Sequence, residues 1–130
     1  MINKESLNFI SNRYQNIFKP DQINDLSYYY ASNIKAYFNS VELSLEELKI
    51  SLSAINNYYK NIHTNIEDTI ISGNKIIVRM KRIVTRVKDD FQYDVDIAVI
   101  NSIAQNKIIN FHALCSKKEY SEVALSSVGK

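Results

Sequence analysis

Glycine and proline are almost absent from this chain, and their scarcity limits what it can fold into. Only two glycines and one proline occur among 130 residues, where average usage would give about fifteen. Both residue types interrupt helices and strands, so we expect long, continuous elements with few irregular loops. With only Gly73 and Gly129, the chain cannot build the glycine-rich phosphate loop of P-loop NTPases or of dinucleotide-binding folds.

The remaining composition is that of a globular domain. Hydrophobic residues make up 45% and charged residues 23% of the chain, which excludes disorder for most of it. No apolar stretch is long enough to cross a membrane, and a net charge of +2 gives no reason to expect nucleic acid or a membrane as partner. The polar N-terminus predicts a cytoplasmic protein, and abundant Asn, Ile and Lys are typical of an AT-rich, bacterial genome.

Hydrophobic periodicity predicts helices in the first half of the chain. Apolar residues recur at spacings of three and four, and Pro20 stands at a helix-starting position. Ser44 and Glu47 have the spacing of a capping box, which marks another helix start. These signals predict three helices, at about residues 3–18, 20–30 and 45–60. They also predict a short strand at about residues 33–39, before the last helix.

The second half changes to a strand pattern. It is rich in Ile, Val and Thr, and turn residues such as those at 72–74 arrive at regular intervals. Short connections between consecutive strands imply an antiparallel meander. We expect residues 1–116 to form one domain and residues 117–130 to form a polar, partly disordered tail. The four strands are expected at about residues 62–71, 75–88, 91–101 and 107–116.

Four stretches of sequence carry a resemblance to a known superfamily. They read NRY with DQI at 12–23, YASN at 30–33, IEDTIISGNKIIVR at 66–79, and DIAV with NKII at 96–109. In order and spacing they resemble the nuclear transport factor two-like superfamily, in particular polyketide-cyclase-like and ketosteroid-isomerase-like proteins. The resemblance implies a cone-shaped α+β barrel of the cystatin-like type. Its curved antiparallel sheet would hold three N-terminal helices in its concave face, around a pocket.

The resemblance also assigns candidate catalytic positions. Ketosteroid isomerases use a Tyr, an Asp that acts as the base and a second, protonated Asp. Tyr14 matches the Tyr, and the second Asp falls on Asp96 if the following hairpin is two residues longer, or on Ala98 without a gap. The base position falls on Phe38, which cannot accept a proton, and an acidic position on the last strand falls near Ala113. Steroid isomerisation by the usual route is therefore not expected.

Strand alternation groups the charged residues of the two central strands on one face. A two-residue turn at residues 89–90 would pair Ile83 with Asp96 and put Lys81 diagonal to it. The resemblance implies that this face is concave, so that Lys81 pairs with Asp96 inside the pocket. The alternative is a cross-strand ion-pair ladder without chemistry. The residues concerned are Arg79, Lys81, Asp94 and Asp96.

With the charged face inside, the apolar face of the same strands would point outward. Such a patch is larger than soluble monomers expose, so we expect a homodimer through the convex sheet face. Arg82 and Arg86 would lie at the patch edge with their charged heads in solvent. The apolar residues are Phe91, Tyr93, Val95, Ile97 and Val99.

These assignments predict a pocket for a small apolar ligand, with Tyr14 and Asp96 as its catalytic groups. Tyr14 also fits a core tyrosine with a satisfied hydroxyl, and Cys115 fits a small buried hydrophobe. His63 and His112 lack a third ligand at suitable spacing, so we expect neither a metal nor a cofactor. The substrate-binding residues would be Phe38, Lys81, Asp94, Phe111, Ala113 and Cys115.

Two functions remain open. One is a pocket protein that binds a small apolar molecule and acts on it as an isomerase, cyclase or dehydratase. The other is a non-enzymatic, dimeric interaction module whose interior is filled by side chains. Tyr14 favours the first function, and Phe38 favours the second. A cavity of roughly 300 Å³ or more that reaches Tyr14 would support ligand binding, and a filled interior would count against it.

Overall fold

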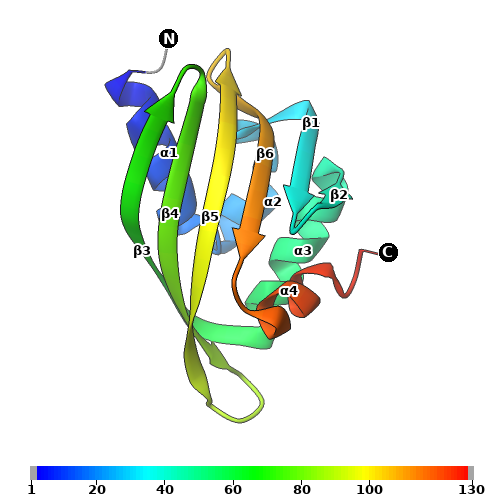
Figure 1. Ribbon diagram of the computed structural model, residues 1–130. Helices are drawn as coiled ribbons and strands as arrows, with labels where there is room; N and C mark the ends of the chain where they lie inside the picture. Colours follow the sequence, from blue (N-terminus) through cyan, green and yellow to red (C-terminus); the bar gives the residue numbers. More distant parts are fainter. Residues whose placement is uncertain (1–2, 129–130) are drawn as a thin grey trace.

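The computed structural model describes residues 3–128 and shows an α+β fold. One six-stranded sheet has α1 behind its long strands, with α3 and α4 together toward the lower right of Figure 1. The helices are α1 (Lys4–Asn16), α2 (Pro20–Asn24), the 3₁₀ helix η1 (Leu26–Tyr28), α3 (Leu45–Tyr58) and α4 (Lys118–Leu125). The strands are β1 (Tyr30–Phe38), β2 (Val41–Leu43), β3 (Tyr59–Ser72), β4 (Lys75–Arg86), β5 (Gln92–Ala104) and β6 (Lys107–Cys115).

The sheet is mixed, whereas the sequence predicted an antiparallel one. Its strand order is β2-β1-β6-β5-β4-β3. The meander from β3 to β6 is antiparallel as expected, but β1 pairs with β6 in parallel. Parallel neighbours need a long crossover between them, and α3 with the first three meander strands supplies it.

Local sequence signals set the ends of several elements. Asn3 caps α1 by accepting a hydrogen bond from the backbone N–H of Ser6 at 3.0 Å. Ser44 and Glu47 form the predicted capping box at the start of α3. Gly73 turns β3 into β4 with a φ of +63°, in the region that favours glycine.

The connection between β4 and β5 is longer than the two-residue turn expected. β4 ends at Arg86 and β5 begins at Gln92. Lys81 therefore lies opposite Asp96, and Ile83 lies opposite Asp94, which corrects the predicted register by two residues. Because the shift is even, every side chain keeps the face that alternation gave it.

The sheet faces the opposite way from our expectation. Val95, Ile97 and Val99 face the helices and are 0%, 4% and 3% exposed. The side chains of Asp94 and Asp96 are 58% and 67% exposed, on the outer face. Burying each aliphatic side chain gains about 1.5–3 kcal/mol, whereas burying a carboxylate without a partner is costly. The hydrophobic effect therefore determines which face of the sheet packs against the helices, and the expectation from the resemblance that Asp94 and Asp96 lie inside is wrong.

The C-terminal segment forms a helix where a polar tail was expected. Tyr120, Val123 and Ala124 of α4 are buried, and Glu119 accepts a hydrogen bond from the hydroxyl of Tyr58 in α3 at 2.7 Å. The three buried residues recur at the spacing of a helical face, which is a signal in the sequence that we missed. Residues 129–130, also part of the expected tail, lie outside the described residues.

Candidate functional site

A cavity lies between the helices and the inner face of the sheet, and we call it the interior cavity. It reaches Tyr14, but its volume is about 50 Å³, which holds about three to five water molecules. This is well below the roughly 300 Å³ of a typical ligand site, so the interior is largely filled, and the structure does not show the pocket of that size that the sequence led us to expect. The wall residues are Tyr14, Ile17, Phe18, Tyr30, Phe38, Leu48, Ser51, Leu52, Ile55, Met80, Arg82, Ile97, Val99, Phe111, Ala113 and Tyr120.

The wall of the interior cavity is apolar except for a few side chains. None of its residues is Asp, Glu, His or Lys, so the wall offers no general base that works near neutral pH. Phe38, Phe111 and Ala113 lie on this wall, where the sequence analysis expected them. The polar wall residues are Tyr14, Tyr30, Ser51, Arg82 and Tyr120.

Tyr14 lies in the last turns of α1 and points at the sheet. Its hydroxyl donates to Oδ1 of Asn101 at 2.7 Å, and the amide of Asn101 donates to the carbonyl oxygen of Ile76 at 3.1 Å. Burial raises the pKa of Tyr14 well above its ordinary value, and the neighbouring Tyr30 raises it further. Tyr14 therefore stays protonated, and its single proton is directed at Asn101.

Asn101 is the β5 residue that contacts Tyr14, and the sequence analysis missed it. The resemblance offered Asp96 or Ala98 as the partner, but both lie on the outer face. Asn101 is fully buried and continues the inward stripe of β5, so a polar residue at the end of an apolar alternation was the available signal. Because an amide side chain does not ionise, the pair that Asn101 makes with Tyr14 is a fixed hydrogen bond. The stripe residues before it are Val95, Ile97 and Val99.

Arg82 projects from β4 into the interior and is only 5% exposed. Its Nε donates to Oγ1 of Thr64 at 2.9 Å, Nη1 donates to the Tyr120 hydroxyl at 3.0 Å, and Nη2 lies 3.4 Å from Sδ of Met80. The guanidinium also stacks over the ring of Phe18 at 4.9 Å. The expectation that Arg82 would hold its head in solvent is wrong, because its face of the sheet is the inner one.

Arg13 of α1 is a second buried arginine. Its Nε donates to the Tyr30 hydroxyl at 3.1 Å, and Nη1 donates to the carbonyl oxygen of Gln22 at 3.4 Å. The guanidinium lies 4.9 Å from the ring centres of both Tyr29 and Tyr30. Its Nη2 has no hydrogen-bond partner within the described part of the chain, so Arg13 is held by neutral groups alone.

The charged residues predicted for the pocket lie on the outer face of the sheet. Nζ of Lys81 is 3.8 Å from a carboxylate oxygen of Asp94 and 3.7 Å from one of Asp96. All three side chains are exposed, so their placement in the pocket was wrong. The arrangement is the ion-pair ladder that the sequence left as the alternative, and such exposed pairs contribute little stability.

Cys115 lies at the end of β6, outside the wall of the interior cavity. It is half-buried, and burial raises the pKa of its thiol. The thiol lies 3.7 Å from the carbonyl oxygen of Lys117. A raised pKa keeps the thiol protonated and unreactive, which fits the alternative that Cys115 is a small packing residue.

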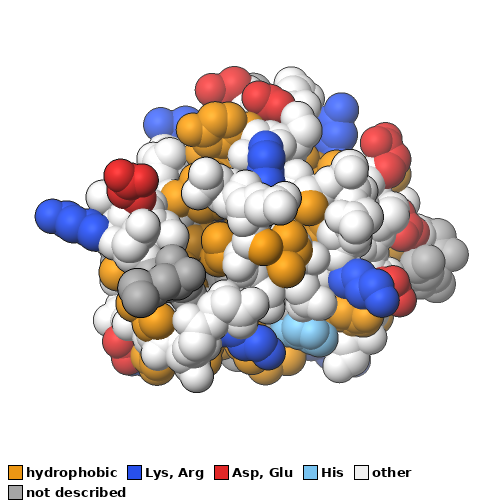
Figure 2. Space-filling model, turned by 90° about the horizontal axis from the view of Figure 1, so that it is seen from above, with side chains coloured by type: hydrophobic (Ala, Val, Ile, Leu, Met, Phe, Trp, Pro, Cys, Tyr) orange, Lys and Arg blue, Asp and Glu red, His pale blue; other side chains and the backbone are white. Residues whose placement is uncertain are grey.

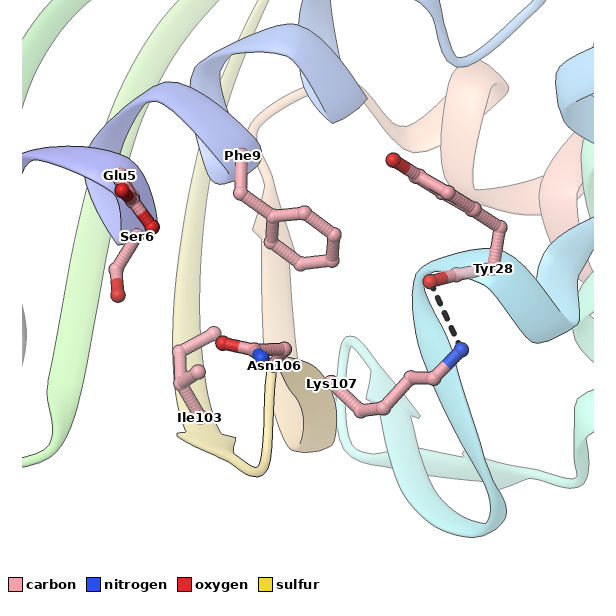
Figure 3. A pocket seen from close by; sticks show the side chains of 7 residues that line it. All are labelled: Glu5, Ser6, Phe9, Tyr28, Ile103, Asn106 and Lys107. Atoms are coloured by element: carbon pink, nitrogen blue, oxygen red, sulfur yellow. Dashed lines mark hydrogen bonds between the residues drawn. The ribbon is translucent and has the colours of Figure 1, made fainter.

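A surface groove of about 360 Å³ lies between the start of α1 and the β5–β6 turn. Figure 3 shows Lys107 reaching across it to the carbonyl oxygen of Tyr28, at 3.0 Å. Figure 2 views this end of the molecule and shows hydrophobic side chains exposed among charged ones. The ammonium of Lys107 is bound by the carbonyls of Ser27 and Tyr28, and the other polar side chains of the groove are Glu5, Ser6 and Asn106.

Within residues 3–128, no three His, Cys, Asp or Glu side chains are grouped so that they could hold a metal ion. No helix in that range has the length and hydropathy needed to cross a bilayer.

Comparisons with known proteins rest on structure, since no family model and no curated protein matches the sequence. A candidate SnoaL-like polyketide cyclase from a Jannaschia species superposes with a TM-score of 0.76 at 9% identity, over 92% of this chain and 91% of that one. A candidate polyketide cyclase from Acidithiobacillus ferrooxidans gives 0.76 at 10% identity, over 99% of both chains. A candidate isomerase from Rhodopseudomonas palustris gives 0.74 at 12% identity, over 96% of this chain and 99% of that one. A protein with a ketosteroid-isomerase-like fold from Catenulispora acidiphila gives 0.69 at 11% identity, over 80% of this chain and 82% of that one. The chain therefore has the nuclear transport factor two-like fold of the polyketide-cyclase-like and ketosteroid-isomerase-like proteins.

Proposed function

We propose that this protein binds in the interior cavity a molecule much smaller than the ligand expected from the sequence, and does not act on it by proton abstraction. The observation that carries the proposal is a cavity at which polar side chains from α1, β1, β4 and α4 converge, in an interior that is otherwise packed. Ligand sites typically combine an apolar wall with a few convergent polar groups. The structural neighbours, named as cyclases and isomerases, support small-molecule binding at this fold.

The size of the cavity restricts the ligand. A volume of about 50 Å³ accepts a molecule of a few non-hydrogen atoms and excludes ring systems of polyketide or steroid size in this conformation. The wall is mostly aliphatic and aromatic, so it would contact mainly the apolar atoms of the ligand. Phe38, at the position of the isomerase base, lines the cavity and supplies only apolar contact.

The test is a fragment titration followed by the methyl resonances of the cavity wall. Molecules of up to about five non-hydrogen atoms should shift the methyl signals of Leu52, Ile97 and Val99. Ala113→Leu fills the cavity from β6 and should abolish the shifts. Ala98→Leu adds the same atoms on the outer face of β5 and should leave them intact. Binding that survives Ala113→Leu, or no shift with any fragment, would overturn the proposal.

A second candidate function is homodimerisation through the outer sheet face. Val95, Ile97 and Val99 of the stripe that first motivated a dimer are buried, and Phe91 is exposed in the β4–β5 loop. Another apolar row crosses the outer face. Strand pairing places its members side by side in the order Ile70, Ile77, Ile100, His112 and Tyr37. The rings of Tyr37 and His112 stack at 4.5 Å, and Leu114 beside the row is 52% exposed. A two-fold pairing of this row would cover it on both copies.

Sedimentation at micromolar concentration tests the dimer. Ile100→Lys places a charge at the centre of the row and should leave only monomer. Val87→Lys changes an exposed apolar residue in the β4–β5 loop and should leave the dimer intact. A wild-type protein that sediments as a 15.0 kDa monomer would remove this candidate.

A further inference from the structure

We propose that Arg82 and Tyr120 bind the carboxylate of a short-chain acid, so that the ligand of the interior cavity is a small monocarboxylate. This inference rests on the proposed function, because it names the chemical class of the ligand for the same cavity. Both residues lie on the cavity wall and already touch each other, with Nη1 of Arg82 3.0 Å from the Tyr120 hydroxyl.

The charge of the interior favours an anionic ligand. Arg13 and Arg82 are 0% and 5% exposed, and no Asp or Glu is buried within residues 3–128. Neither arginine takes part in an ion pair with the described residues. Buried charges in proteins are normally paired, so an interior with two cations and no anion has a place for an anionic ligand.

Hydrogen-bond donors also remain unused at the cavity wall. The guanidinium of Arg82 has five N–H groups, and its three contacts to Thr64, Tyr120 and Met80 use one on each nitrogen. One N–H therefore remains on each terminal nitrogen. Tyr120 accepts from Arg82, and its own proton has no acceptor in the described chain. Arg82 and Tyr120 can thus donate to the two oxygens of one carboxylate, as charge-assisted hydrogen bonds.

The protonation state of Tyr120 agrees with this role. Burial raises the pKa of Tyr120 above its ordinary value, although Arg82 opposes the rise. The hydroxyl is therefore protonated at neutral pH and serves as a donor. Arg82 stays charged, because guanidinium groups do not deprotonate in proteins.

The size of the interior cavity limits the length of the acid. A cavity of about 50 Å³ has room for roughly three to five water-sized groups, which corresponds to a carboxylate with a tail of one or two carbons. Leu48, Leu52 and Ile55 of α3 supply apolar wall for such a tail. Acetate and propionate fit this description. Ligands of so few atoms bind with micromolar dissociation constants at best.

The experiment is a titration of the full chain with sodium propionate at fixed ionic strength, followed by thermal unfolding and by the guanidinium NMR signals of the arginines. We expect the melting temperature to rise by about 5 °C at a tenfold excess over Kd, with movement of the Arg82 signals. Propionamide, which has the same shape without the charge, should bind at least about tenfold more weakly. Sodium chloride at equal concentration should leave the Arg82 signals unmoved.

Two arginine variants of the same strand provide matched controls. Arg82→Met removes the charge from the cavity and should weaken propionate binding by about tenfold or more. Arg79→Met removes the same charge from the outer face of β4, where Arg79 pairs with Glu67 at 3.3 Å, and should leave the affinity unchanged. If Arg82→Met does not fold, the Arg82 signals of the wild-type titration decide alone.

The outcomes separate this inference from the proposed function. Equal binding of propionamide and propionate, or full affinity in Arg82→Met, would overturn the carboxylate site and leave small-molecule binding standing. An effect of chloride equal to that of propionate would show a halide site and also overturn it. No binding of either probe, together with no binding of neutral fragments, would overturn both.

Discussion

Lys81 and Arg82 are adjacent in β4, yet the two faces of the sheet treat them in opposite ways. Lys81 points outward, is 37% exposed and lies near two carboxylates. Arg82 points inward, is 5% exposed and has only neutral partners. Water solvates the outer cation, so its carboxylate partners matter little. The inner cation has lost that water and depends entirely on what surrounds it.

The comparison shows which polar residues in a sequence mark a site. The cluster of Arg79, Lys81, Asp94 and Asp96 resembled an active site because opposite charges gathered on one face. The structure places this cluster on the solvent-exposed face of the sheet, where charged side chains carry no cost of desolvation. The polar residues of the interior are single interruptions of apolar stripes. Arg82 interrupts the inner stripe of β4, and Asn101 interrupts that of β5. An isolated interruption of the inner face was therefore the more informative signal.

The largest predicted effect comes from placing a charge on each face in turn. Val95→Asp puts a carboxylate at a fully buried position of β5 and should cost about 4 kcal/mol or more of unfolding free energy. Ala98→Asp puts the same group on the outer face, opposite Arg79, and should change stability by about 0.5 kcal/mol or less. Urea unfolding of both variants measures the difference. Equal effects would mean that the assignment of the two faces is wrong.

Most of the fold could be predicted from the sequence because it depends on local patterns. The capping box of Ser44 and Glu47 and the turn at Gly73 each depend on a few neighbouring residues, and the scarcity of glycine and proline favours long elements. The elements that these signals predicted exist. The parallel pairing of β1 with β6 could not be predicted in this way, because it joins residues about 75 apart in sequence and no local signal specifies it. The helix α4 was missed because it is short and charged or polar residues occupy half of its eight positions.

The candidate site was predicted in part. Tyr14, Phe38, Phe111 and Ala113 do line the interior, because their positions follow from the fold. Alternation also grouped the β4 and β5 residues correctly, but it cannot say which group faces the helices. That choice was made from the resemblance, although the aliphatic character of Val95 and its neighbours favoured the opposite. The inward position of Arg82 and Asn101 follows as soon as the apolar group is placed inside.

Raising the pH tests the inner face without a mutation. Burial raises the pKa of Tyr59 to about 12, from an ordinary value of about 10, and its hydroxyl is hydrogen-bonded to Tyr93. Between these values the folded chain binds more protons than the unfolded chain, so stability falls as the pH rises. The expected loss is about 2–3 kcal/mol by pH 12. An unfolding free energy in urea that stays constant between pH 10 and pH 12 would contradict this account of the inner face.

A double-mutant cycle tests the fixed hydrogen bond of the inner face. Tyr14→Phe leaves the buried Oδ1 of Asn101 without its donor and should cost about 1–3 kcal/mol. Asn101→Leu removes the acceptor and also the donor to Ile76, so it should cost at least as much. The two losses should not add, because both variants break the same contact. Additive losses in urea unfolding would show that Tyr14 and Asn101 are not coupled.

The smallest effect is predicted for the outer ion pair. Lys81→Met and Asp96→Asn remove partners that lie 3.7 Å apart, with side chains 37% and 67% exposed. Water replaces the lost partner on either side, so each variant should lower the unfolding free energy by less than about 0.5 kcal/mol, and raising the salt concentration should shrink even that. Arg82→Met, one residue along the strand, provides the contrast, because its loss leaves the Tyr120 and Thr64 contacts of a buried site unmade. A coupling of more than about 1 kcal/mol between Lys81 and Asp96 would show that the outer ladder is shielded from water, for example beneath a second copy of the chain.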